Sequence, residues 1–214
     1  MTITTEDGNR QKIKKYALPF PYLIVKDWYS SEECELIWKE LDFLSDFEKL
    51  QRYSLSGAYK PSPDGGIINL SSHKSLYLNQ VFVHERMSNI AIITKKLFSS
   101  GILSLYAKLD VYAKSSLNLH QANIKIGYYE NNDSYGAHYD EHNFTCISYF
   151  YKEPKKFSNG NLHFVDFGIE YECLNNSMII FPSHIRHKVN PINFFGESNK
   201  KEGRFYITQF LSYR

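Results

Sequence analysis

The sequence contains few cysteines, and their positions exclude two classes of small domain. Cys34, Cys146 and Cys173 are far apart, and no C-x-x-C pair occurs. Disulfide scaffolds and zinc ribbons both require cysteines at close, regular spacing. We therefore expect a protein of a reducing compartment, in which Cys146 is a small core residue.

Long apolar runs and blocks of like charge are also absent. No stretch of about 18 consecutive apolar residues occurs, so we expect no membrane-spanning helix. Residues 1–15 are polar and lack the apolar segment of a signal peptide, which favours a cytoplasmic location. The formal net charge is only +2, so neither a nucleic-acid partner nor a membrane partner is expected.

The composition itself is that of a globular protein. Apolar residues make up 43% and charged residues 22% of the chain, and 17 Tyr with 15 Phe suit a β-rich core. No internal repeat divides the chain. We expect one α+β domain over 1–214, with a helical support and candidate lid at 16–122 and a catalytic core at 123–214.

The N-terminal half is predicted to be mainly helical. Ser30 and Glu33 form a capping-box pattern ahead of apolar residues at helical spacing. Residues 52–74 are rich in Ser, Gly, Pro and Asp and show neither helical nor strand periodicity, which indicates a long loop and candidate lid. The expected elements are a loose leader at 1–15, a strand at 18–28, a helix at 31–44, the loop at 52–74, and helices at 85–99 and 102–113.

The C-terminal half is rich in short runs of β-branched and aromatic residues separated by turn residues. This texture is typical of an antiparallel sandwich or barrel, here a jelly roll with the helices packed on one side. The expected strands are 123–129, 144–151, 161–167, 177–182, 187–192 and 204–213.

His138 and Asp140 form an H-x-D pair, which is the first candidate for chemistry. In a strand, residues i and i+2 point to the same face, so both side chains can reach one metal ion. Two histidines and one carboxylate suit Fe(II) and leave coordination positions open. The segment IIFPSHIRHKVNPI offers the second histidine. We favour His187, which shares a strand face with Val189, over His184, which we expect to be a solvated loop residue.

Arg204 opens the last predicted strand and shares one face with Tyr206, Thr208 and Phe210. An arginine that faced the interior of a barrel would be costly without an anion, whereas a bidentate carboxylate would satisfy it. Arg204 is therefore a candidate anchor for a dicarboxylate. Lys200 and Lys201 are substitutes if Arg204 faces solvent.

The segments YYENNDSYGAHYDEH, NGNLHF, MIIFPSHIRHKVNPI and GRFYITQF together resemble the 2-oxoglutarate/Fe(II)-dependent oxygenases, in the prolyl 4-hydroxylase-like branch. Tyr129 precedes His138 by nine positions, as a tyrosine does in that branch. The H-x-V-x-P motif begins at His187, and the R-x-x-x-T motif comprises Arg204 and Thr208. The resemblance implies a double-stranded β-helix core over about 123–213.

The resemblance also implies a cofactor set and roles. His138, Asp140 and His187 would hold Fe(II), and the cosubstrates would be 2-oxoglutarate and O2, with ascorbate as a further reductant. Arg204 would bind the far carboxylate of 2-oxoglutarate, near Tyr129, Tyr149 and Thr208. A carboxylate at Asp140 disfavours the halogenating variants, which have a small residue there.

Hydroxylation of a prolyl residue in a peptide or protein is the expected activity. One alternative is hydroxylation of a free amino acid or another small molecule. Another is a cupin-like binding module without turnover. The complete set of His138, Asp140, His187 and Arg204 argues against a binding module, because a degenerate site could lose any of them. A nucleic-acid demethylase of the AlkB type is disfavoured because Phe210 stands where a second arginine is usual.

Several other side chains are given minor roles at this stage. Tyr53, Tyr59 and Tyr77 are candidate substrate contacts from the lid region. His142 is expected to be exposed and His163 to point outward. No partner can be assigned from the sequence to the three remaining histidines, His73, His84 and His120.

Overall fold

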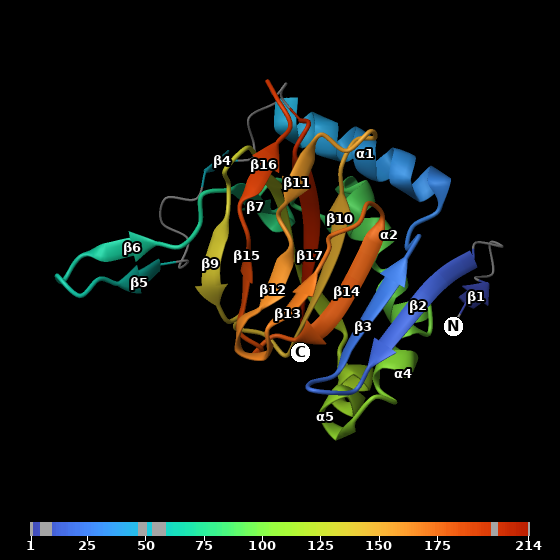
Figure 1. Cartoon of the computed structure of the whole chain (residues 1–214). Coiled ribbons are helices and arrows are strands. Elements are labelled where there is room, and N and C mark those ends of the chain that lie inside the picture. The colour runs from blue at the N-terminus through green and yellow to red at the C-terminus, as the bar shows by residue number, and fades with distance from the viewer. Residues whose placement is uncertain (1, 5–9, 47–50, 53–58, 198–200, 214) are drawn as a thin grey trace.

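Two antiparallel sheets of unequal size face each other in the computed structural model, which describes residues 2–4, 10–46, 51–52, 59–197 and 201–213 (Figure 1). The large sheet has the order β1 (Thr2–Thr4), β2 (Arg10–Tyr16), β3 (Tyr22–Lys26), β14 (Ser177–Pro182), β10 (Phe144–Phe150), β17 (Arg204–Ser212), β8 (Gln121–Tyr129), β7 (Lys74–Tyr77) and β4 (Gln51–Arg52). The small sheet has the order β13 (Ile169–Tyr171), β12 (Leu162–Phe164), β15 (His187–Val189) and β9 (Tyr135–His138). A separate two-stranded sheet pairs β11 (Phe157–Asn159) with β16 (Ile192–Phe194).

The central strands are apolar on both faces because the large sheet is covered on both sides. On β14, Met178 and Ile180 belong to the core beneath the helices, whereas Ile179 and Phe181 belong to the core between the two sheets. Strand β10 divides its side chains in the same way. This double burial explains the nearly continuous apolar runs FTCISYF and SMIIFP, and it confirms the strands predicted at 144–151 and 177–182.

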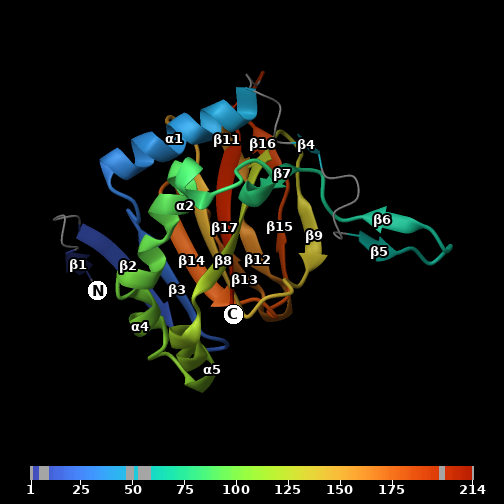
Figure 2. The same cartoon turned by 180° about the vertical axis from the view of Figure 1, so that it is seen from behind.

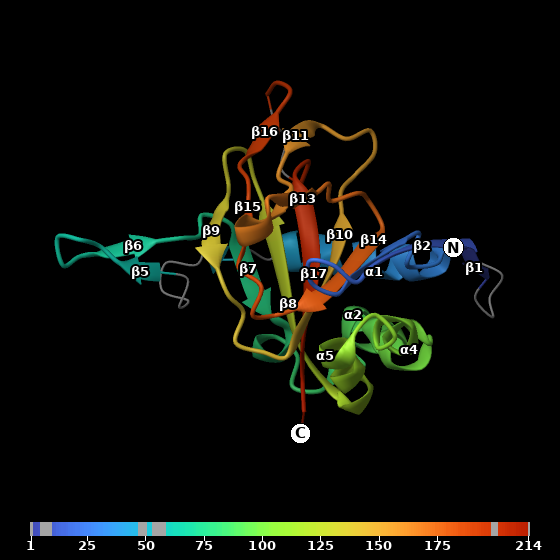
Figure 3. The ribbon, with the colours of Figure 1, turned by 60° about the horizontal axis from the view of Figure 1, so that its bottom comes forward.

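Helices cover the outer face of the large sheet, opposite the small sheet (Figures 2 and 3). They are α1 (Ser31–Asp46), α2 (Asn89–Thr94), α3 (Lys96–Ser99), α4 (Ile102–Tyr106) and α5 (Val111–Lys114), with 3-10 turns at η1 (Leu78–Gln80), η2 (Glu85–Met87) and η3 (Ser115–Asn118). A further 3-10 turn, η4 (Val165–Phe167), follows β12 and contacts β15 of the small sheet. Trp38 of α1 packs edge-on against Phe150 and Phe205 of the sheet. No helix in the described part of the chain combines the length and the apolarity needed to cross a membrane.

The predicted capping box at the start of α1 is confirmed. The Glu33 amide donates to Ser30 Oγ at 3.2 Å, and the Ser30 amide donates to Glu33 Oε2 at 2.8 Å. These two bonds satisfy backbone donors that a helix start otherwise leaves without partners. Because Ile37, Leu41 and Leu44 are fully buried, the cap also fixes where the helix enters the core.

The predicted long helices at 85–99 and 102–113 are both wrong as single elements. Ser88 caps α2 by accepting from the Ala91 amide at 3.0 Å, and it donates in turn to Glu40 of α1 at 2.5 Å. The carbonyl of Thr94 accepts from the Gln209 side chain at 3.1 Å, and α2 ends there. Asp110 caps α5 and separates it from α4. The contacts of Ser88 and Thr94 therefore set the bounds of α2, and the Asp110 cap divides the second predicted helix into α4 and α5.

The expected loose leader at 1–15 is also wrong for the residues that the structure describes. Strand β2 pairs with β3 from Lys12–Lys26 to Tyr16–Tyr22, and β1 pairs with β2. Ile13 is 3% exposed and belongs to the core beneath the helices. The strand predicted at 18–28 is confirmed by β3, whereas β7 places another part of the expected helical support inside the large sheet.

The loop expected at 52–74 is a hairpin in its described part. Strand β5 (Tyr59–Pro61) pairs with β6 (Ile67–Asn69), and the hairpin extends away from the body (Figure 1). Its base is joined to β9, where the Gly136 amide donates to the carbonyl of Leu70 at 2.6 Å. No residue from 59 to 69 lines the pocket described below, so the described hairpin does not lie over the site as a lid.

Candidate metal and cosubstrate site

His138 ends strand β9 at the edge of the small sheet. Its Nδ1 lies 2.8 Å from the carbonyl oxygen of Gly136. Because a carbonyl can only accept, Nδ1 must carry the proton, and the lone pair of Nε2 is then free to bind a metal ion. The ring stacks on Tyr135 with centroids 3.7 Å apart, which fixes its plane.

His187 begins strand β15, directly across the ladder from His138. Its Nδ1 lies 2.8 Å from the carbonyl oxygen of Ile185, which selects the same tautomer as in His138. The edge of Phe181 packs against the ring, and the side chain is almost fully buried. Two imidazoles are thus presented with their Nε2 atoms toward one point.

Asp140 completes the cluster from just after β9, and not from within a strand as the H-x-D interpretation assumed. Its amide donates to the carbonyl of Ser183 at 3.0 Å, which anchors this turn to the end of β14. One carboxylate oxygen lies 3.6 Å from His138 Nε2 and the other 3.5 Å from His187 Nε2. Thr145 donates to Oδ2 at 2.6 Å and so orients the carboxylate.

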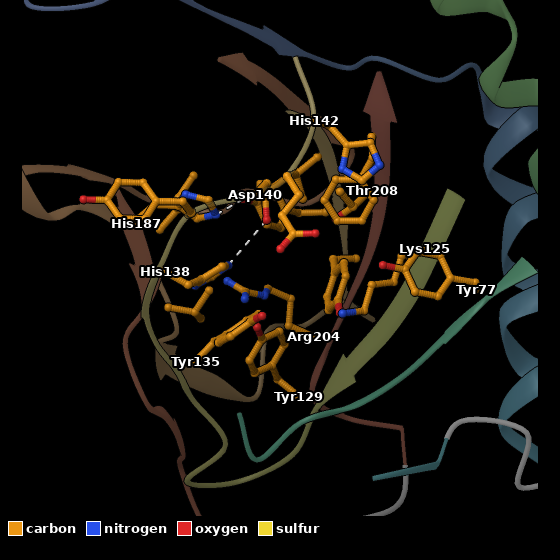
Figure 4. Close-up of a pocket in the computed structure, with 18 residues that line it drawn as sticks. Tyr77, Lys125, Tyr129, Tyr135, His138, Asp140, His142, His187, Arg204 and Thr208 are labelled. Atoms are coloured by element: carbon orange, nitrogen blue, oxygen red, sulfur yellow. Dashed lines mark ion pairs between the residues drawn. The ribbon is translucent and has the colours of Figure 1, made fainter. Parts of the chain in front are cut away.

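These three residues fit a divalent metal ion by donor type and by position. One ligand atom from each lies within 4.8 Å of the others. Figure 4 shows the three side chains grouped on one side of the pocket. Burial and then the neighbouring His187 hold the pKa of His138 well below its ordinary value, so this imidazole is neutral, as a ligand must be. Two histidines and one carboxylate on one side of an ion are the donor set suited to Fe(II).

His184 lies outside this cluster. Its side chain is exposed and packs edge-on against Tyr112 at 5.0 Å. The structure therefore brings together His187, and not His184, with the H-x-D pair.

Arg204 lies at the start of β17 with only 1% of its surface exposed. Its Nη1 donates to the carbonyl of Gly160, whereas its Nε has no hydrogen-bond partner among the described residues. No carboxylate in that part of the chain pairs with it. A buried guanidinium with an unsatisfied donor is a candidate binding group for an anion.

Two tyrosines flank this guanidinium. The Arg204 Cζ atom lies 4.7 Å from the ring centroid of Tyr129 and 5.1 Å from that of Tyr149. The hydroxyl of Tyr149 is buried beside the Cys173 thiol and makes no hydrogen bond of normal geometry. Burial raises the pKa of Tyr149 well above its ordinary value, so the hydroxyl keeps its proton and can donate to an anion.

One pocket of about 200 Å³ is lined by all seven residues predicted to bind the metal or the cosubstrate. They are Tyr129, His138, Asp140, Tyr149, His187, Arg204 and Thr208. Thr208 lines it from β17, on the same face as Arg204. Tyr139, with 59% of its surface exposed, and the exposed Glu141 mark its mouth. The metal-ligand cluster and the buried arginine thus share one cavity with an opening to solvent.

The proposed substitutes for Arg204 do not reach the pocket. Lys201 Nζ lies 3.5 Å from Asp42 of α1, and Lys200 is outside the described residues. Among the tyrosines considered as substrate contacts, Tyr77 lines the pocket, Tyr59 lies in β5, and Tyr53 is outside the described residues.

The sequence analysis missed two histidines near the site. His142, expected to be exposed, is half-buried and stacks on Phe210 with centroids 4.7 Å apart. His73, for which no partner was assigned, is 1% exposed and lies 2.7 Å from the Tyr206 hydroxyl and 4.5 Å, between centroids, from the Tyr129 ring. His163 is half-buried on β12 and does not line the pocket, while His84 and His120 are exposed.

Lys125 of β8 is a further pocket residue that the sequence analysis did not consider. It is 8% exposed, and burial lowers its pKa to about 8, an effect that Asp140 opposes. A signal was available, because Lys125 alternates with apolar residues in a strand that was predicted correctly. A lysine on the inner face of such a strand is, like Arg204, a candidate binding residue for an anion.

No protein-family model and no curated protein matches the sequence. Solved structures do match the fold. A prolyl 4-hydroxylase from Pseudomonas putida has a TM-score of 0.54 at 14% identity, over 90% of this chain and 92% of that one. A 2-oxoglutarate-Fe(II) oxygenase family protein from Burkholderia pseudomallei has a TM-score of 0.55 at 11% identity, over 89% and 84%.

A prolyl hydroxylase from Trichoplax adhaerens, solved with a peptide fragment of hypoxia inducible factor, has a TM-score of 0.52 at 15% identity, over 89% and 83%. This chain therefore has the mixed helical and antiparallel fold of 2-oxoglutarate-Fe(II) oxygenases, with prolyl hydroxylases among its structural relatives.

Proposed function

We propose that this protein is an Fe(II)- and 2-oxoglutarate-dependent dioxygenase that hydroxylates an unactivated C–H bond. One observation carries the proposal. Two imidazoles held in the metal-binding tautomer, a carboxylate, and a buried arginine whose Nε has no partner among the described residues line the same pocket. A non-catalytic binding module would have no need of this combination. We also assign the two facing sheets to the double-stranded β-helix of these enzymes.

His138, Asp140 and His187 would hold the iron through Nε2, a carboxylate oxygen and Nε2. The Gly136 and Ile185 carbonyls keep both imidazoles in the binding tautomer, and Thr145 keeps the carboxylate oriented. When bound there, Fe(II) with 2-oxoglutarate and O2 supplies the oxidising power for hydroxylation, and ascorbate would keep the iron ferrous.

Arg204 would bind the carboxylate of 2-oxoglutarate that lies far from the metal. Among the described residues, the Nε of Arg204 and the hydroxyl of Tyr149 are two buried donors for which no hydrogen-bond partner is found. An anion that accepted from both would satisfy them together. Tyr129 and Thr208 border the same volume and would complete the cosubstrate site.

The fold relatives favour a prolyl residue in a peptide or protein as the substrate, and the alternative is a free amino acid or another small molecule. The Trichoplax adhaerens relative was solved with a peptide fragment. This likeness is one of fold, so the substrate must be decided by experiment.

Succinate release from 2-oxoglutarate tests the proposed function. Purified protein with Fe(II), 2-oxoglutarate and O2 should form succinate, and a screen of prolyl peptides against free amino acids should identify which class accelerates it. His163→Ala, which changes a histidine outside the pocket, is the matched control for His138→Ala. Equal succinate release by wild type and His138→Ala would contradict the proposal.

A further inference from the structure

His73 is a buried histidine that lies behind the wall of the pocket. It is 1% exposed and does not line the pocket itself, whereas Tyr129, Tyr135 and Tyr206 do. Its ring contacts all three, with centroid distances of 4.5 Å to Tyr129, 5.3 Å to Tyr135 and 5.5 Å to Tyr206. One side chain therefore supports three aromatic residues of the pocket wall.

Two of these tyrosines each contact a residue of the proposed catalytic centre. The ring of Tyr129 faces the guanidinium of Arg204, whose Cζ lies 4.7 Å from the ring centre. The ring of Tyr135 stacks on His138, with centroids 3.7 Å apart and planes 11° from parallel. His73 contacts both tyrosines and stacks on Tyr129 at 21°. A continuous series of ring contacts thus joins the 2-oxoglutarate anchor to a metal ligand.

Hydrogen bonds fix the ring of His73 within this series. Its Nδ1 lies 2.7 Å from Ser71 Oγ, and its Nε2 lies 2.7 Å from the Tyr206 hydroxyl. Because both ring nitrogens are bonded, the imidazole cannot turn without the loss of a buried hydrogen bond. Tyr206 is itself held over β8, where a Cβ added to Gly127 would clash with its ring. The glycine therefore leaves room for the tyrosine that bonds His73.

The backbone around His73 passes from one sheet to the other. Ser71 forms a β-bridge with Tyr135 of β9, in the small sheet. Lys74 begins β7 and pairs with Tyr128 of β8, in the large sheet. His73 lies between these two contacts, so both its backbone and its side chain connect the sheets.

The two ends of the proposed 2-oxoglutarate site belong to different sheets. His138 lies on β9 of the small sheet, and Arg204 lies on β17 of the large sheet. A molecule that chelates the metal with one end and pairs its far carboxylate with an arginine has a nearly fixed length. Both contacts can form together only when the spacing of the two residues is maintained by the groups that support them.

We propose that His73 is a positioning residue, which holds Tyr129 and Tyr135 in place and so sets the spacing between Arg204 and the metal ligands. This inference rests on the proposed function, which assigns His138 to the metal and Arg204 to 2-oxoglutarate. Loss of the His73 ring should therefore weaken the coupling between metal binding and 2-oxoglutarate binding. The affinity for the metal alone should be nearly unchanged, because no ligand is lost.

Calorimetric binding of 2-oxoglutarate with and without Mn(II) tests this inference in two variants that fill the buried space. His73→Gln keeps polar groups but loses the ring, and His73→Phe keeps a ring but loses the hydrogen bonds. In wild type Mn(II) should tighten 2-oxoglutarate binding at least about tenfold. This factor should fall below about threefold in His73→Gln and lie between the two values in His73→Phe. Mn(II) affinity without 2-oxoglutarate should change less than about threefold in both.

Ser88→Ala is the control for a general loss of stability. Ser88 is fully buried, donates to Glu40 at 2.5 Å and lies outside this pocket. The control variant should unfold at a lower urea concentration than wild type and keep the wild-type tightening. A loss of tightening in this control as large as in His73→Gln would overturn the inference, because destabilisation alone would then explain it.

Three further results would overturn the inference. They are wild-type tightening in His73→Gln, tightening in His73→Phe that is no greater than in His73→Gln, and a fall in the affinity for Mn(II) alone as large as the fall in tightening. Failure of the proposed function gives a different result, since wild type itself would then show no tightening by Mn(II), and the inference would fall with it.

Discussion

Arg204 on β17 lies directly across the sheet from Tyr129 on β8, with its guanidinium carbon 4.7 Å from the centre of the Tyr129 ring. Arg204 and Tyr129 are almost fully buried, whereas Tyr139, which lines the same pocket, is 59% exposed. A buried cation held over an aromatic face is suited to bind an anion. This relationship makes the binding of 2-oxoglutarate directly testable.

Replacement of Arg204 by Met should weaken the use of 2-oxoglutarate and spare the metal site. Removal of one partner of a buried charge pair typically costs about 3–5 kcal/mol, so the 2-oxoglutarate concentration for half-maximal succinate release should rise at least about 100-fold. Mn(II) affinity, measured by calorimetry, should change less than about threefold, because Arg204 is not among the metal ligands. Lys201→Met is the control, and a larger effect from that variant would contradict the assignment.

The choice between the two nearby histidines predicts a sharp contrast in metal binding. His187→Ala removes one of three ligands and should abolish Mn(II) binding in the micromolar range. His184→Ala changes an exposed side chain three positions away and should leave it unaltered. Calorimetric titration of both variants checks this, and retention of tight binding by His187→Ala would refute the proposed ligand set.

Thr145 should influence the metal through Asp140 alone. Its hydroxyl donates to Asp140 Oδ2 at 2.6 Å and lies 2.8 Å from Ser183 Oγ. Thr145→Val keeps the shape but loses the donor, and partners of this kind typically contribute about 10–100-fold to metal affinity. Thr145→Ser should restore binding. If the valine and serine variants bound Mn(II) equally well, the hydroxyl would have no orienting role.

The large sheet was largely predictable, because its central strands appear in the local sequence as short apolar, aromatic and β-branched runs. In β10 and β14 nearly every residue is apolar since both faces are covered, and β17 was identified from its aromatic and β-branched residues. Strand β2 carries no such signal. Its sequence RQKIKKY is mostly basic, and the strand forms through pairing with β3 and the burial of Ile13. Such non-local pairing leaves little trace in the local sequence.

The residues of the site were predictable to different degrees. His138, Asp140 and Arg204 were candidates from the sequence because their chemical types and spacing are distinctive, and the structure brings them into one pocket. His142 and Lys125 were missed because their roles depend on which face of the pocket they line, and only the register of β8 against β17 shows this for Lys125. The environment of His73 was the hardest to predict, because its partner Tyr206 is 133 positions away in the sequence.

Lys125 should make the stability of the metal-free protein depend on pH. Its pKa falls from an ordinary 10.5 to about 8 in the folded protein, so between these values the unfolded chain binds more protons. Stability should therefore rise with pH from about 8 to about 10.5, and below this window the charged lysine destabilises the fold. Lys125→Met should remove this rise and stabilise the protein at pH 7 by on the order of 1–3 kcal/mol.

Urea unfolding at several pH values measures this effect, with Lys108→Met as the control. A pH dependence that is the same in wild type and Lys125→Met would show that Lys125 is not buried in the way described.

The most direct test of the central claim is the binding of 2-oxoglutarate with and without Mn(II), measured by calorimetry in wild type and in Asp140→Ala. A shared site predicts that Mn(II) tightens 2-oxoglutarate binding at least about tenfold in wild type and has no effect in Asp140→Ala. Equal 2-oxoglutarate affinity with and without the metal in wild type would contradict the assignment of His138, Asp140, His187 and Arg204 to one catalytic centre.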